Sequence, residues 1–126
     1  MMTKREFLAG VAAAAALSRV GWAAQVRDVD LVVYNERYAD ARAFAQVHAA
    51  HGIATLPMEG DAGVLWYSQL RHRIAAGGRR IAGIGTHTDF FILHTLAREA
   101  GLRVRSSTRL PASYDHSGLL VSWTMA

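Results

Sequence analysis

Short apolar runs and amphipathic stretches follow one another along the chain, and the clearest pair lies between residues 80 and 101. The run from Ile81 to Ile84 is apolar without alternation, which predicts a strand buried on both faces. The stretch after it predicts a helix, because Thr86 and Asp89 have the spacing of a capping box and Gly101 is placed to end it. The apolar side of this helix is expected to carry Phe90, Ile92, Leu93, Leu96, Ala97 and Ala100.

The same two patterns recur on either side of this unit. We expect further strands at 30–34, 53–57, 102–106 and 118–123, and further helices at 36–50 and 62–76. Asn35 and Asp61 are the candidate N-caps of these two helices, and Pro57 predicts an edge position for the second strand, because proline cannot donate to a ladder. The side chains expected to face inward are Ala41, Phe44, Val47 and His48 on the first helix and Trp66, Tyr67, Leu70 and Ile74 on the second.

The resulting order, βαβαβαββ, predicts an α/β fold with an open, mostly parallel, doubly wound sheet and helices on both faces. We expect the strand order 2-1-3-4-5, as in flavodoxin-like folds. No helical period precedes the last strand, and the polar segment 114–117 suits a turn. The last strand is therefore expected to run antiparallel to its neighbour, since parallel neighbours need a longer crossover.

Residues 1–23 have the pattern of a signal peptide, with a basic start, an apolar stretch at 7–17 and small residues around a cleavage site at 21–23. The sequence Thr-Lys-Arg-Glu-Phe-Leu at 3–8 resembles the core of twin-arginine secretion signals, with Lys4 in place of the first arginine. This resemblance implies export to the periplasm in a folded state. The apolar stretch is shorter than the roughly 20 residues that span a bilayer, so we expect no stable membrane span after cleavage and a single domain over 24–126. A general secretory signal and an uncleaved membrane anchor stay open as alternatives.

Composition removes several classes of chemistry. The chain of 126 residues has no cysteine, which excludes thiol nucleophiles, disulfides and iron–sulfur clusters, and Lys4 is its only lysine, which excludes a P-loop or Schiff-base lysine in the domain. The charge of +4 falls to +2 without the leader, where 11 arginines face 9 acidic residues. These arginines are scattered along the sequence, apart from Arg79 and Arg80 at the start of one predicted strand and Arg103, Arg105 and Arg109 near another, so we expect no nucleic-acid partner.

In a doubly wound sheet, ligands bind where the strands end at their carboxyl side. This rule gathers the loops 35–38, 59–61 and 86–89 into one rim. The ligand-binding residues that we expect there are Asn35, Glu36, Arg37, Thr86, His87 and Thr88. His87 with Glu36 or Asp61 is the candidate catalytic pair. The rim residues Glu36, Glu59, Asp61 and His87 share no metal-binding motif, so no metal site is predicted.

Familiar catalytic and cofactor motifs do not fit the chain. Gly83-Ile-Gly85 begins like a dinucleotide fingerprint, but Thr88 stands where the third glycine is needed. No Gly-x-Ser-x-Gly elbow occurs. The sequence therefore predicts an exported, non-catalytic α/β domain that binds a small ligand or serves as an accessory subunit of a larger periplasmic protein. The alternative is a small hydrolase or transferase that uses His87 with Glu36 or Asp61.

Overall fold

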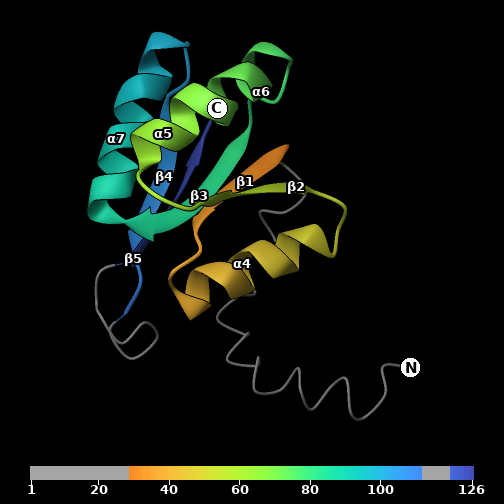
Figure 1. Ribbon diagram of the computed structural model, residues 1–126, viewed down its shortest axis with the longest axis vertical. Coiled ribbons are helices and arrows are strands. Elements are labelled where there is room, and N and C mark those ends of the chain that lie inside the picture. The colour runs from red at the N-terminus through yellow and green to blue at the C-terminus, as the bar shows by residue number, and fades with distance from the viewer. Residues whose placement is uncertain (1–28, 112–119) are drawn as a thin grey trace.

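The structure is a computed structural model, and it describes residues 29–111 and 120–126. The expected signal peptide and the expected turn at 114–117 lie outside these residues. The described part is an α/β fold with one open five-stranded sheet, in the order β2-β1-β3-β5-β4 (Figure 1). The strands β1, β2 and β3 are mutually parallel, and β5 is antiparallel to both of its neighbours. The predicted α/β class, the open sheet and the antiparallel last strand are confirmed, but the sheet is mixed, with two parallel and two antiparallel strand pairs, where a mostly parallel one was expected.

The elements follow one another in the predicted alternation. Their bounds are β1 Leu31–Asn35, α4 Ala39–Ala49, β2 Ala54–Met58, α5 Ala62–Leu65, the π-helical turn η1 Trp66–Leu70, α6 Arg71–Ala75, β3 Ile81–Thr86, α7 His87–Glu99, β4 Val104–Arg109 and β5 Leu120–Met125. Helix α4 covers one face of the sheet, and the continuous helix α5–η1–α6 lies with α7 on the other (Figure 1). The sheet therefore has a core on each side.

The core on the α7 side is the larger of the two. Its fully buried side chains include Leu31, Met58, Leu70, Ile81, Leu93, Trp123 and Met125. The core on the α4 side is built from Val29, Val32, Ala41, Phe44, Ala45, Ala82, Ile84, Leu110 and Leu120. The strands β1 and β3 contribute to both cores, which explains their apolar runs without alternation.

The predicted order 2-1-3-4-5 is wrong at its last two positions, because β5 lies between β3 and β4. The two strands differ in what they can bury. Every residue of β4 is exposed, whereas β5 buries Leu120, Val121, Trp123 and Met125. An apolar strand gains most from an inner position, and a polar one is stable at an edge. The antiparallel pairing of β5 with β4 then follows from their connection without a helix.

Asn35 is not the N-cap of the first helix. It ends β1, and α4 begins only at Ala39 after Tyr38, whose side chain makes no capping bond. The side chain of Asn35 is instead buried and directed to a residue of the third loop. The prediction failed because the partner that stabilises this amide lies 54 residues away in the sequence.

The π-helical turn changes which side chains of the second helix face the sheet. Tyr67 was expected inward but is 57% exposed, while Leu65, on the expected polar side, is buried. A π turn takes more residues than an α turn, so it rotates the following residues around the helix axis. As a result Leu70 and Ile74 share the buried side with Ala62 and Leu65. A pattern read at a uniform period of 3.6 residues could not show this.

Candidate functional site

The carboxyl ends of β1 and β3 meet at the predicted rim. The two strands are parallel neighbours in register from Leu31 with Ile81 onward. At the end of β1, Asn35 Nδ2 donates a 2.8 Å hydrogen bond to Asp89 Oδ2. This bond joins the end of β1 to the first turn of α7. The expectation that the first and third loops face each other is confirmed by this contact.

Asp89 is the buried carboxylate of the rim, with 8% of its surface exposed. Its Oδ2 also accepts the Thr86 backbone N–H at 2.9 Å, and the Thr86 hydroxyl accepts the Asp89 N–H at 3.1 Å. The predicted capping box is thus present. The carboxylate occupies the positive end of α7, where an anionic ligand would otherwise be favoured. The arrangement therefore disfavours a phosphate at this helix terminus.

Both glycines of the Gly83-Ile-Gly85 segment make room for side chains of the protein itself. A Cβ on Gly85 would lie 2.7 Å from Asp89 Oδ2, and a Cβ on Gly83 would lie 2.3 Å from the Trp123 ring. Each glycine thus lets a buried side chain pack directly on the backbone of β3. The glycine pair serves packing, in agreement with the rejection of a dinucleotide site from the sequence.

The remaining predicted residues of the first and third loops are open to solvent. Arg37, His87 and Thr88 are exposed, and Glu36 is half-buried. The backbone N–H of Arg37 donates to Asn35 Oδ1 at 3.1 Å, which holds the first loop against the end of β1. The ring of His87 meets Phe90 edge-on, with 6.3 Å between the centroids. The four side chains are free to contact a ligand from solvent.

The candidate catalytic pair is not assembled. Asp61 caps α5, as predicted, because its Oδ1 accepts the Val64 N–H at 2.9 Å. In residues 29–111 and 120–126, no hydrogen bond or ion pair links His87 to Glu36 or Asp61. The same residues contain no group of three histidine, aspartate or glutamate side chains that could hold a metal ion. Asp61 and Asp89 thus each cap the start of a helix.

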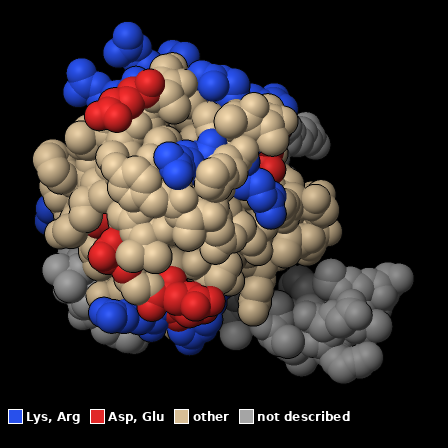
Figure 2. Space-filling model, turned by 45° about the horizontal axis from the view of Figure 1, so that its top comes forward, with Lys and Arg blue, Asp and Glu red and all other residues tan. Residues whose placement is uncertain are grey.

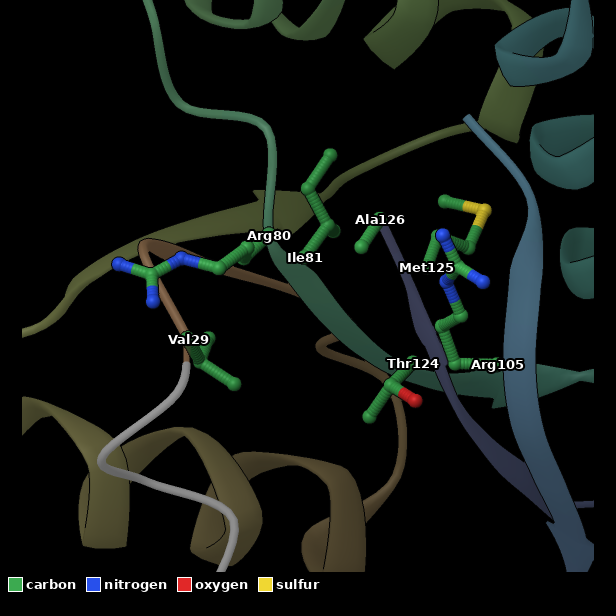
Figure 3. A pocket seen from close by; sticks show the side chains of 7 residues that line it. All are labelled: Val29, Arg80, Ile81, Arg105, Thr124, Met125 and Ala126. Carbon is green, nitrogen blue, oxygen red and sulfur yellow. The ribbon is translucent and has the colours of Figure 1, made fainter. Parts of the chain in front are cut away.

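A hollow of about 260 Å³ lies at the opposite end of the sheet from the rim. It is lined by Val29, Arg80, Ile81, Arg105, Thr124, Met125 and Ala126. Figure 3 shows Arg80 and Arg105 on opposite sides of it, with Ile81 and Ala126 between them. Arg80 is already paired with Asp30, through a 2.7 Å contact from its Nη2 to the Asp30 Oδ1. This pair, above all its hydrogen bonds, lowers the pKa of the Asp30 carboxyl.

The sequence showed three arginines near the fourth strand, but it did not show that this strand forms the outer edge of the sheet. Arg105 and Arg109 lie on β4, and Arg103 immediately precedes it. The signal in the sequence was a strand segment that is polar on both sides, Val-Arg-Ser-Ser-Thr-Arg, which is typical of an edge strand. Figure 2 shows arginines along the upper border of the molecule with acidic side chains beside them at the upper left, and acidic and basic side chains next to each other at the lower left.

No protein-family model, curated protein or solved structure matches this chain. None of the helices in the described part of the chain combines the length and the hydrophobicity needed to cross a bilayer.

Proposed function

We propose that the chain is an exported, non-catalytic α/β domain that works by binding, either of a small ligand at the rim or of a larger periplasmic protein as its accessory subunit. One observation carries the proposal. The buried carboxylate Asp89 is held by Asn35 and by the Thr86 backbone N–H, so it is unavailable to activate His87. A histidine catalyst needs a partner group within hydrogen-bond reach to orient it.

The rim residues that remain exposed suit recognition. Arg37 supplies fixed donors and Glu36 supplies acceptors, while His87 and Thr88 supply both. They are placed by the ends of two adjacent parallel strands and by a capped helix, which is a rigid support for a binding loop. This position next to the reversal in strand order is where open α/β sheets commonly bind ligands.

Export is the part of the proposal that rests on the leader. The basic start with Arg5, the short alanine-rich apolar stretch and the small residues at 21–23 support it. A twin-arginine route accounts for a domain that folds before it is secreted.

The binding proposal is tested by mapping ligand contacts on the isotopically labelled full chain by NMR, with acetate, glycine, glucose and inorganic phosphate as probes. We expect at least one probe to shift the amides of Glu36, Arg37, His87 or Thr88. His87→Ala should weaken that binding at least tenfold and change the free energy of unfolding by less than about 0.5 kcal/mol, as for other surface residues. The rim proposal fails if no probe moves a rim amide, or if binding is the same in His87→Ala.

A further inference from the structure

The outer strand β4 is exposed in an unusual way. Among the strands of residues 29–111 and 120–126 it pairs with β5 alone, on one side, and all six of its residues, Val104–Arg109, are exposed. The other edge strand, β2, is half-buried and carries Pro57, which weakens it as a template for a further strand. β4 has no proline, and its outer backbone groups are open, so a further strand could pair with it.

The hydrogen bonds to β5 show which backbone groups of β4 remain unused. The Leu110 N–H donates to the Leu120 carbonyl at 2.9 Å, and Ser107 and Arg109 lie opposite Trp123 and Val121. In an antiparallel ladder, pairs that exchange hydrogen bonds alternate with pairs that do not. Counting back from Leu110, the N–H and C=O groups of Ser107 and Arg109 point away from β5, toward the open edge.

The side chains of β4 place positive charge along the outer edge of the sheet. Arg109 lies opposite Val121, which packs in the core on the α7 side, so Arg109 is on that face. Arg105 lies within the β-bulge between Val104 and Ser106, and it lines the hollow together with Thr124 and Met125. Within the residues that the structure describes, neither arginine has a carboxylate partner. The edge is therefore cationic and open.

We propose that β4 docks an extended, acidic segment of a partner protein, which adds to the sheet as a sixth strand. The backbone groups of Ser107 and Arg109 would supply the pairing, and Arg105 and Arg109 would select carboxylate side chains of the incoming strand. A second copy of β4 is a poor occupant. It would bring the same arginines to an edge that is already cationic, whereas an acidic segment complements that charge.

This inference rests on the proposal that the chain works by binding, and it names the class of partner. It uses a surface separate from the rim, because β5 lies between β4 and β3. The two ideas therefore fail separately: His87→Ala should leave docking at β4 unchanged.

The test measures binding of the full chain to a labelled short peptide of Glu, Val and Thr with glutamates on both faces of the extended strand. A peptide with lysine in place of each glutamate is the control. We expect binding of the acidic peptide alone. Arg105→Gln with Arg109→Gln should weaken it at least tenfold, whereas Arg73→Gln, an exposed arginine on α6, should not.

The backbone part of the inference is tested by Ser107→Pro, which removes an outward N–H, against Ser107→Ala, which keeps it. Only the proline variant should lose binding. Amide exchange in the unaltered chain gives an answer that needs no variant: the acidic peptide should slow exchange at Ser107 and Arg109. The inference is overturned if these amides stay unprotected, if the lysine peptide or anionic lipid vesicles bind equally well, or if the chain dimerises through β4.

Discussion

The bond between Asn35 and Asp89 ties the two halves of the rim together, and its removal gives a quantitative prediction. Asp89→Ala deletes half of the capping box, which costs about 1 kcal/mol. It also leaves the buried Asn35 amide without its acceptor, which costs about 1–3 kcal/mol. We therefore expect a total loss of about 2–4 kcal/mol, a large share of the roughly 5–10 kcal/mol available to a small domain.

The pair should also be coupled. Asn35→Ala alone leaves Asp89 with one buried hydrogen bond fewer. The double variant removes both partners, so neither side chain of the pair is left buried without its hydrogen-bond partner. The two single variants and the double variant would be compared by denaturant unfolding. The double variant should lose at least about 1 kcal/mol less free energy of unfolding than the two single variants lose in sum. Thr88→Ala, an exposed change in the same helical turn, should cost less than about 0.5 kcal/mol. Additive losses would refute the view that this bond holds the rim.

Three further predictions concern the core, the response to pH and export. Leu93→Ala, at a fully buried position, should cost about 2–5 kcal/mol in thermal or denaturant unfolding, while exposed Arg98→Ala should cost little; equal losses would mean that the face of α7 is misassigned. Burial lowers the pKa of His48 from its ordinary value of 6.5, and its Nδ1 contacts the Phe44 carbonyl at 2.9 Å. Below pH 6.5, His48 therefore becomes protonated more readily in the unfolded chain than in the folded one, so the free energy of unfolding should fall between pH 7 and pH 5. His48→Gln should make the free energy of unfolding less dependent on pH in this range. The same pH dependence in both proteins would contradict this. Arg5→Lys should abolish export through the twin-arginine translocase, and unchanged export in a strain that lacks the translocase would refute that route.

Local signals in the sequence were sufficient for several features of the site. The capping box of Thr86 and Asp89 and the cap at Asp61 involve residues within one helical turn, and both are present. The meeting of the loops after β1 and β3 followed from the rule for doubly wound sheets, and the bond from Asn35 to Asp89 confirms it.

The features that the sequence did not reveal depend on contacts between distant residues or on departures from regular geometry. Asn35 was assigned to a helix cap from its local backbone donors; its Oδ1 does accept the nearby Arg37 N–H, but its Nδ2 donates to Asp89 in another loop, which the sequence did not show. The inner position of β5 can be predicted only when β4 and β5 are compared by the apolar side chains that each can bury. Trp123 of β5 packs on Gly83, whereas β4 has no large apolar side chain to bury. The exposure of Tyr67 follows from a π turn, which has no simple pattern in the sequence.

The most direct test of the central claim, that the chain binds and does not catalyse, is a search for turnover that depends on His87. The full chain would be assayed with p-nitrophenyl acetate and p-nitrophenyl phosphate beside His87→Ala, Glu36→Gln and Asp61→Asn. The account predicts the same rates for all four proteins, equal to the rate in buffer, because the rim carboxylate Asp89 is bound to Asn35 and Thr86 and Asp61 caps a helix. Turnover above the buffer rate that falls at least tenfold in His87→Ala, and also in Glu36→Gln or Asp61→Asn, would contradict the account and identify an enzyme.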